Sequence, residues 1–178
     1  MVQEEINRPP FYKFSPTELE EIVNSVVIKT VPVRIWTEFN HKHGLPQYET
    51  VGSSGLDVRA NDSVTIPPNT TKLVPTGIFV DIPTGYEIQV RPRSGLSLKT
   101  FLRIGNSPGT IDHSYKGEIG IIAHNTSNED SISINLGDRI AQLVLQKVPY
   151  LTWIPLNSKD ELTPSERGDK GFGHTGIN

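Results

Sequence analysis

The sequence predicts an all-β protein in which many short strands form a β-barrel or sandwich. The 178-residue chain contains 15 Gly and 14 Pro, which are spread between short runs of β-branched residues. Apolar and polar residues alternate in several of these runs, as is typical of half-buried strands joined by tight turns. The length suits one domain, or one subunit of an oligomer with arms.

The composition excludes several kinds of chemistry. The 17 basic and 20 acidic residues give a formal charge of −3, so no global basic field attracts nucleic acid. Because the chain has no Cys, it can form no disulfide, thiolate nucleophile or Cys-based metal site. No apolar run approaches the roughly 20 residues needed to span a bilayer, and no apolar signal segment follows the single Met. We expect a cytoplasmic protein, with the nucleus as the alternative, that binds neither membranes nor nucleic acid.

Residues 1–29 are expected to form an arm and a helix that precede the β domain. The segment Ser15-Pro16-Thr17-Glu18 supplies an N-cap, a proline at the first helical position and a capping-box Glu. Apolar residues then recur at i, i+3, i+4, i+7 and i+8, which predicts an amphipathic helix over residues 16–27. The apolar stripe favours packing against the helix's own domain over docking to a partner.

The period then changes, and residues 30–164 are assigned to the β domain. Val31, Val33 and Ile35 alternate with polar residues and predict a first strand. Pro32 indicates that this strand lies at a sheet edge, because proline cannot donate to a strand ladder.

The loop over residues 40–52 contains two histidines, His41 and His43, that could be taken for metal ligands. A zinc site needs three or four protein donors, and no third ligand is near in the sequence. We interpret both as solvated loop residues.

Strand and turn signals alternate at short spacing through the rest of the domain, which supports a barrel or sandwich. Further strands are predicted over residues 56–59, 64–66, 72–82, 86–90, 97–104, 118–123, 131–135 and 140–145.

Two polar residues are unexpected within these strands. Asp57 is either a hydrogen-bond acceptor near a turn or a charge that is used at a site. Gln142 lies among apolar neighbours and needs a partner, since an unsatisfied buried amide costs about 1–3 kcal/mol. A backbone partner within the fold is the simplest expectation.

Residues 91–99 (RPRSGLSLK) form a basic loop. Its guanidinium forks, hydroxyls and ammonium could bind phosphate, and its glycine would let a backbone N–H approach closely. A solvated turn is the alternative that the loop alone leaves open.

Residues 109–118 (GTIDHSYKGE) display a carboxylate and a phenol three residues apart, Asp112 and Tyr115. Turn residues on both sides and strand-like flanks predict a hairpin-like segment. Taken alone, Asp112 could be a turn former and Tyr115 a half-buried strand aromatic.

The tail over residues 165–178 is rich in glycine and could be a disordered terminus. It also contains Arg167, Lys170 and a lone aromatic, Phe172, between glycines. These groups fit a flexible lid that closes on a flat, phosphorylated ligand, with the aromatic ring stacked on a base.

Together these segments resemble the trimeric deoxyuridine triphosphatases (dUTPases). The resemblance covers essentially residues 30–178. It depends on five stretches in the family's order, which are residues 52–59, 91–99, 106–118, 137–145 and 167–176.

The resemblance implies a jelly-roll-like β-barrel subunit with a short N-terminal helix and a glycine-rich C-terminal arm. Subunits would assemble as a homotrimer, with each active site built from several chains and closed by the arm. The implied reaction is hydrolysis of dUTP to dUMP and pyrophosphate, which keeps uracil out of DNA and supplies dUMP for dTMP synthesis. Asp112 would act as the general base that activates a water for attack on the α-phosphorus.

The resemblance also implies roles for other residues. The uracil and deoxyribose would be contacted by Asn106, Gly109, Thr110, Ile111, Tyr115 and Phe172. The phosphates would be contacted by Arg93, Ser94, Gly95, Gln142, Arg167, Gly173, His174 and Thr175. Asp57 would hold a Mg²⁺-bound water or the Arg93 guanidinium. The cofactor Mg²⁺ would be held by the phosphates and water, without a direct protein ligand.

Two other functions stay open. A dCTP deaminase resembles the dUTPases in fold and ligand, but it should use a Glu-centred site, whereas this chain has Asp112 and Tyr115. A protein that binds a partner when loaded with nucleotide could use the N-terminal helix for docking.

Overall fold

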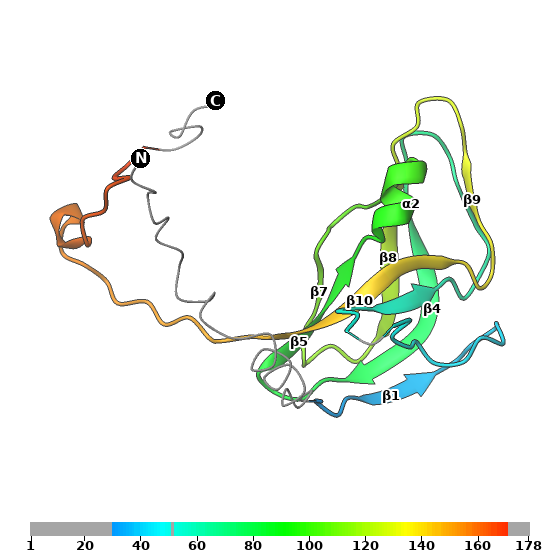
Figure 1. Cartoon of the computed structure of the whole chain (residues 1–178), viewed down its shortest axis with the longest axis horizontal. Helices are drawn as coiled ribbons and strands as arrows, with labels where there is room; N and C mark the ends of the chain where they lie inside the picture. The colour runs from blue at the N-terminus through cyan, green and yellow to red at the C-terminus, as the bar shows by residue number, and fades with distance from the viewer. Residues whose placement is uncertain (1–29, 51, 171–178) are drawn as a thin grey trace, which may run out of the picture.

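The computed structural model describes residues 30–50 and 52–170, which form an almost entirely β structure (Figure 1). The predicted helix over residues 16–27 and the tail from residue 171 lie outside the described residues. The strands are β1 Arg34–Thr37, β2 Leu56–Arg59, β3 Val64–Ile66, β4 Thr71–Asp81, β5 Tyr86–Arg91, β6 Leu102–Ile104, β7 Gly109–Ile111, β8 Glu118–Asn125, β9 Ile132–Ile134 and β10 Arg139–Lys147.

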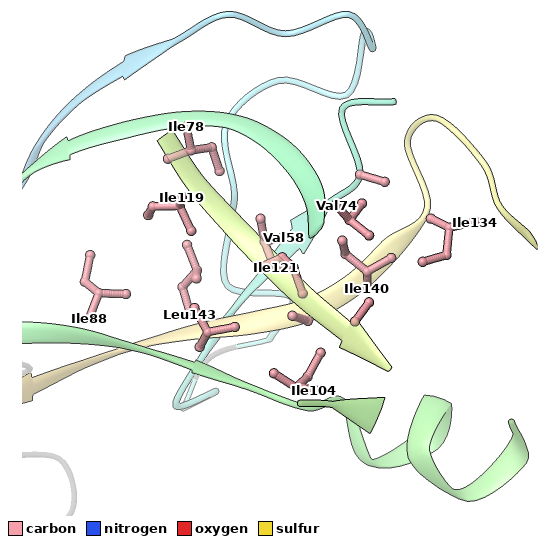
Figure 2. Close-up of a cluster of buried hydrophobic side chains, with 14 of the residues drawn as sticks. Val58, Val74, Ile78, Ile88, Ile104, Ile119, Ile121, Ile134, Ile140 and Leu143 are labelled. Carbon is pink, nitrogen blue, oxygen red and sulfur yellow. The ribbon is translucent and has the colours of Figure 1, made fainter. Parts of the chain in front are cut away.

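Two four-stranded sheets face each other across the core, in the orders β1-β4-β8-β6 and β2-β10-β5-β7, and β3 pairs with β9. All the pairs are antiparallel. Aliphatic side chains from both sheets fill the space between them, among them Val58, Val74, Ile119 and Ile121 (Figure 2). The alternation in the sequence produces this core because every second strand residue points inward.

The strands over residues 64–66, 72–82, 86–90, 118–123, 131–135 and 140–145 are confirmed within one or two residues at most ends. In β5, for example, Ile88 and Val90 are buried and their neighbours less so. β10 extends from Arg139 to Lys147 and lies between β2 and β5.

The first strand begins later than predicted. β1 covers Arg34–Thr37 rather than the alternation from Val31, and its Ile35 is 41% exposed. Its position at a sheet edge, expected from Pro32, is confirmed. Without a strand on its other side, β1 has only one ladder of hydrogen bonds among the described residues, which limits its length.

The prediction of a strand over residues 97–104 is wrong in its first half. Ser94–Lys99 form a short helix, α2, and β6 begins only at Leu102. Local bonds stabilise the helix, since Ser97 N donates to Arg93 O and the Thr100 hydroxyl donates to Leu96 O, at 3.0 and 2.7 Å. Of the two leucines in α2, Leu96 packs partly against the core, whereas Leu98 is 85% exposed.

The hairpin-like interpretation of residues 109–118 is also wrong. β7 pairs with β5 in one sheet, whereas β8 pairs with β4 and β6 in the other. Residues 112–117 therefore connect the two sheets and do not close a hairpin. Turn residues indicate that the chain reverses direction, but they do not determine with which strand the following strand pairs.

After β10 the chain leaves the barrel (Figure 1), and residues 149–170 are exposed throughout. This segment contains a single 3-10 turn, η2 Lys159–Glu161. Within the described ranges, no helix has the length and apolar character required to cross a membrane.

Candidate active site

A basic pocket lies where β2, β10 and the start of α2 meet. Gln142 of β10 stands opposite Asp57 of β2 and Arg91 of β5 in the sheet register. The end of β5 delivers the chain into α2, which brings its first residues beside these strands. The pocket is lined by Glu49, Asp57, Arg93, Ser94, Gly95, Lys99, Arg139 and Gln142, with Ser53, Ser54, Gly55, Leu96 and Thr100.

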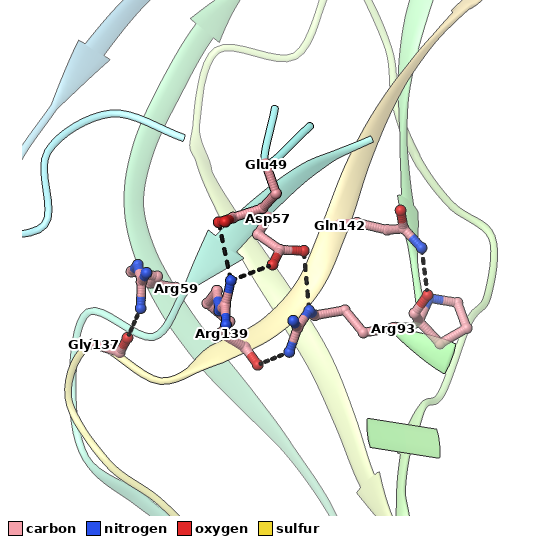
Figure 3. A network of polar contacts seen from close by, with 8 residues as sticks. Glu49, Asp57, Arg59, Arg93, Gly137, Arg139 and Gln142 are labelled. Carbon is pink, nitrogen blue, oxygen red and sulfur yellow. Dashed lines mark hydrogen bonds and ion pairs between the residues drawn. The ribbon is translucent and has the colours of Figure 1, made fainter. Parts of the chain in front are cut away.

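Asp57 holds two guanidinium groups in this basic pocket (Figure 3). Its Oδ1 lies 3.0 Å from Nε of Arg93, and its Oδ2 lies 3.3 Å from Nη1 of Arg139. The Asp57 side chain is only 15% exposed, so both contacts are partly shielded from water. Of the two contacts expected for Asp57, the one to Arg93 is present.

The remaining contacts of the two arginines orient them further. Nη1 of Arg93 donates to the carbonyl of Arg139 at 3.2 Å. Glu49 Oε1 lies 3.0 Å from Nη1 of Arg139. With Lys99, the basic pocket has three cationic side chains and two carboxylates. This excess of positive charge, with donors arranged in forks, suits an anion with several oxygens.

Gln142 has a backbone partner within the fold, as its sequence position predicts. Its Nε2 donates to the carbonyl of Pro92 at 2.8 Å. Ser94 and Gly95 open α2 beside it. Among the described residues, no atom lies within 4 Å of the place where a Cβ of Gly95 would be. The backbone here is open to close approach by a ligand.

Arg139 and Glu49 belong to this pocket, but the sequence analysis did not single them out. Strict alternation places Arg139 and Gln142 on opposite faces of β10. A register shift between Arg139 and Ala141 interrupts that alternation, and both side chains line the pocket. In the sequence, an Arg directly after Gly137-Asp138 looks like part of the turn. Only the bulge shows that its side chain lies in the pocket, and a bulge is not visible in the sequence.

A second group of predicted residues lies on β7, in the turn before it and in the connection that follows it. We call this group the β7 cluster: Asn106, Gly109, Thr110, Ile111, Asp112 and Tyr115. Gly109 is buried, and a Cβ there would lie 3.1 Å from Nδ2 of Asn106. The Asn106 amide therefore lies directly against the backbone of Gly109. Such an arrangement combines amide and backbone groups, which can read the edge of a flat polar ring.

Asp112 and Tyr115 belong to one turn, in which Tyr115 N donates to Asp112 O at 3.1 Å. Asp112 is exposed, and Tyr115 is 44% exposed. The Tyr115 hydroxyl donates to the Glu118 carbonyl at 2.8 Å, so the hydroxyl is already used within the chain. The exposed part of the ring is what Tyr115 can offer a ligand.

Within one chain, the two groups do not converge. β2 and β7 are three strands apart in their sheet, a separation of roughly 14 Å. Among the described residues, none of the β7 cluster lines the basic pocket.

The lid residues are only partly described. Arg167 lies in an exposed turn, where its Nε donates to the carbonyl of Lys170 at 2.8 Å. It is not part of the basic pocket in this chain. The other predicted lid residues, Phe172, Gly173, His174 and Thr175, lie outside the described residues.

Residues 30–50 and 52–170 contain no group of three or more His, Asp or Glu side chains that could hold a metal ion directly. His41 instead stacks on the ring of Phe39, with the centroids 4.6 Å apart, and the His43 ring lies tilted 5.6 Å from that of His41. Any divalent cation in the basic pocket would have Asp57 and Glu49 as its nearest acidic groups.

An all-β barrel with this basic pocket belongs, by its site, to the proteins that bind phosphorylated ligands. A family model for dUTPase matches residues 41–176. The chain is 50% identical over 134 residues to the deoxyuridine 5′-triphosphate nucleotidohydrolase of Fusobacterium nucleatum subsp. nucleatum, which covers 74% of this chain and 89% of that protein. It is 46% identical over 144 residues to the enzyme of the same name from Chlamydia felis, covering 80% and 97%. The chain therefore belongs to the dUTPase family.

Solved structures agree with this assignment. The dUTPase of Staphylococcus bacteriophage 80alpha with dUpNHpp is 27% identical, with a TM-score of 0.71, and the match covers 83% of this chain and 100% of that one. That work describes phage dUTPases as controlling the transfer of virulence genes by a G protein-like mechanism. The fold is also shared with the dUTPase of phage phi11 of S. aureus, at 22% identity and a TM-score of 0.66, for which a structural Mg(II) ion is described.

Proposed function

We propose that this protein hydrolyses dUTP to dUMP and pyrophosphate. The observation that carries the proposal is the pair of guanidinium groups that Asp57 holds beside Ser94, Gly95 and Gln142 in a family member. Residues 30–164 would form the catalytic barrel and residues 165–178 its lid.

The basic pocket would bind the triphosphate. Arg93 offers a fork of donors, Ser94 a hydroxyl, and Gly95 an unobstructed backbone. Gln142 uses its amide N–H on Pro92, so its position is set before the ligand arrives. Arg139, held on the same carboxylate as Arg93, adds a second guanidinium. Because Asp57 fixes both groups in advance, less side-chain entropy is lost when phosphate binds.

Asp112 would act as the general base. Its carboxylate takes a proton from a water whose oxygen attacks the α-phosphorus. The bond from the α-phosphorus to the oxygen that bridges to the β-phosphorus breaks, and pyrophosphate leaves with that oxygen. An exposed carboxylate on a turn suits this role once a ligand covers it. Positioning and charge neutralisation supply the rest of the rate enhancement.

The β7 cluster would select the base and the sugar. Asn106 and the backbone of Gly109, Thr110 and Ile111 would read the uracil edge. The Tyr115 ring would pack under the deoxyribose and leave no room for a 2′-hydroxyl. The lid would contribute Phe172 on the uracil, with Arg167, Gly173, His174 and Thr175 on the terminal phosphate.

A homotrimer with shared sites would bring these parts together. One chain holds the basic pocket and the β7 cluster about three strands apart, so a site completed by neighbours suits the two groups. The segment after β10 supports this assembly because it exposes large apolar side chains that a neighbouring subunit could cover. Those side chains are Tyr150, Leu151, Trp153, Ile154 and Leu156.

Magnesium would accompany the substrate as its phosphate complex. The described residues supply no complete set of ligands, which fits a cation held by phosphate oxygens and water. When bound, the ion neutralises charge on the phosphates. Asp57 could accept a hydrogen bond from a water on that ion, although its present contacts to Arg93 and Arg139 occupy both oxygens.

A pyrophosphate-release assay with dUTP, dTTP, UTP and dCTP in the presence of Mg²⁺ tests the proposal. We expect turnover of dUTP alone at a substantial rate. Asp112→Asn should keep dUTP affinity and lower turnover by about 10²- to 10⁴-fold. Asp62→Asn is the matched control, since that exposed carboxylate has the N–H of Ser63 as its one hydrogen-bond partner among the described residues. Normal turnover by Asp112→Asn would refute the base, and ammonia release from dCTP would favour a deaminase.

A further inference from the structure

We infer that Glu118 is a positioning residue that sets the discrimination between deoxyribose and ribose by anchoring Tyr115 to an irregularity in β4. This inference rests on the proposed function, in which the Tyr115 ring lies under the sugar. Glu118 itself would touch no substrate.

The irregularity is a bulge opposite the start of β8. Pro75 pairs with Gly120 and Phe79 pairs with Glu118, so the three residues 76–78 of β4 stand against the single residue Ile119. A bulge leaves backbone groups without a partner strand. The Glu118 carboxylate binds two of these backbone groups. Its Oε1 accepts hydrogen bonds from Thr76 N at 2.9 Å and from Gly77 N at 2.7 Å. Hydrogen bonds to an ionised acceptor are about twice as strong as neutral ones.

The bulge itself has little freedom to move. Gly77 has φ of +66°, and a Cβ there would lie 2.6 Å from the Glu38 carbonyl. Thr76 is fully buried, and its hydroxyl donates to the Ile119 carbonyl. Ile78, the last residue of the bulge, and Ile119 opposite it are part of the core between the sheets (Figure 2). The carboxylate is therefore attached to a rigid part of the barrel.

Tyr115 depends on the same residue for its position. Its hydroxyl donates to the Glu118 carbonyl at 2.8 Å. Gly117 allows this contact, since a Cβ at that position would lie 2.5 Å from the Tyr115 oxygen. Tyr115 is 44% exposed, so its hydroxyl contact is one of the restraints on a ring that is only partly covered. Glu118 is held both by its pairing with Phe79 at the start of β8 and by its carboxylate on the bulge, so these contacts together determine where the ring lies.

A 2′-hydroxyl is excluded only if the ring is held close to the sugar. Glu118→Gln replaces the anion by a neutral acceptor and weakens the attachment at Thr76 and Gly77. The ring could then retreat and admit UTP. Lys116 donates to Asp81 and to the His113 carbonyl at 2.7 Å each, and these contacts hold the turn without Glu118. The backbone of the turn that contains Asp112 should therefore keep its position while the Tyr115 ring moves.

The experiment measures kcat/KM for dUTP and for UTP in the full-length protein, Glu118→Gln, Tyr115→Phe and the double variant. Glu87→Gln is the matched control, because that strand carboxylate contacts the Gln89 amide on the other sheet. We expect the dUTP/UTP ratio to fall about tenfold or more in Glu118→Gln and to be unchanged in Glu87→Gln. Since Glu118 acts through Tyr115, the effects of the two single variants on the ratio should be non-additive in the double variant.

An unchanged ratio in folded Glu118→Gln would overturn the inference, even if turnover of both nucleotides fell together. Additive effects would overturn it as well, because they would make Glu118 independent of Tyr115. If Glu118→Gln does not fold, Glu118→Asp, which keeps the charge on a shorter side chain, replaces it with the same expectation. Failure of the unaltered protein to cleave dUTP would instead refute the proposed function, and this outcome is visible before any variant is compared.

Discussion

Gly55 and Gln142 are in contact across β2 and β10, and the contact requires the glycine. A Cβ at position 55 would lie 2.5 Å from Oε1 of Gln142 and 3.2 Å from its Cδ. The amide cannot simply retreat, because its Nε2 is bonded to the Pro92 carbonyl. The small residues before β2 therefore determine how the amide of the basic pocket is presented.

Gly55→Ala should weaken phosphate binding more than it weakens folding. The added methyl group would displace the Gln142 amide, and we expect the KM for dUTP to rise about tenfold, the loss of roughly one hydrogen bond to a charged ligand. Gly120→Ala is the control, since the three atoms nearest to its added Cβ all belong to the exposed Leu73 side chain. Steady-state kinetics beside thermal melting would check this. An unchanged KM would show that Gln142 has no role in binding.

Asp57→Asn should reduce both stability and catalysis. The neutral amide would leave Arg93 and Arg139 close together without a shared anion, and we expect unfolding to become easier by about 1–3 kcal/mol. We expect kcat/KM for dUTP to fall about 10- to 100-fold, because the guanidinium groups are no longer held in advance. Denaturant titration and pyrophosphate release measure the two effects.

Glu49→Gln should have a smaller effect on stability than Asp57→Asn. Its carboxylate contacts only Arg139 of the pair, and its side chain is 57% exposed. We expect a change in stability below about 1 kcal/mol, as for exposed ion pairs. Equal losses in the two variants would contradict the central role of Asp57.

Much of this site was predictable because its residues break local rules. Asp57 is a charge within a strand, and Gln142 is an amide among apolar neighbours, so each required a partner that local sequence did not supply. The partners exist, namely Arg93 and the Pro92 carbonyl. Core positions such as Ile88 and Val90 were predictable from alternation alone.

What could not be predicted depends on pairing between distant segments. Nothing local shows that β7 pairs with β5 while β8 pairs with β4, so the local sequence predicts a hairpin for the connection that contains Asp112. Likewise, the bulge that brings Arg139 to the side of Gln142 is defined only by the register with β2. A regular sequence period cannot predict the side-chain direction of residues that an irregularity of the sheet places.

Stability should fall in mild acid because of His41. Burial lowers the pKa of His41 below its usual 6.5, and the neighbouring charges of His43 and Arg59 lower it further. The unfolded chain therefore binds a proton more readily than the folded one. The stability that neutral His41 contributes to the folded state is complete above about pH 6.5. It is lost as the pH falls below that value toward the lowered pKa of His41.

Melting temperatures between pH 7.5 and 5 check this expectation. His41→Asn should flatten the decline of the melting temperature, because no group at that position then gains a proton. His124→Asn is the control, since that half-buried imidazole on β8 contacts the Thr71 hydroxyl at 3.0 Å. A decline of the same steepness in His41→Asn would assign the effect to other groups.

Truncation before Ser165 should leave the barrel folded and nearly abolish turnover. Residues 165–170 are exposed and bond only among themselves in the described structure, so the melting temperature should change little. Pyrophosphate release from dUTP should fall because Arg167 and the rest of the lid are lost. A truncated protein that still works well would contradict the lid.

A mixing experiment tests whether the lid serves the site of another chain. The truncated chain has Asp112 but no lid, and full-length Asp112→Asn has a lid but no base. If each site is built from several chains, subunits exchanged between these two nearly inactive proteins should recover part of the activity, since some mixed sites contain both parts. Truncated chains mixed with truncated Asp112→Asn chains are the control and should stay inactive. Sedimentation of the mixture must show that exchange occurred, and exchanged oligomers without recovered activity would place the lid and the base of each site on one chain.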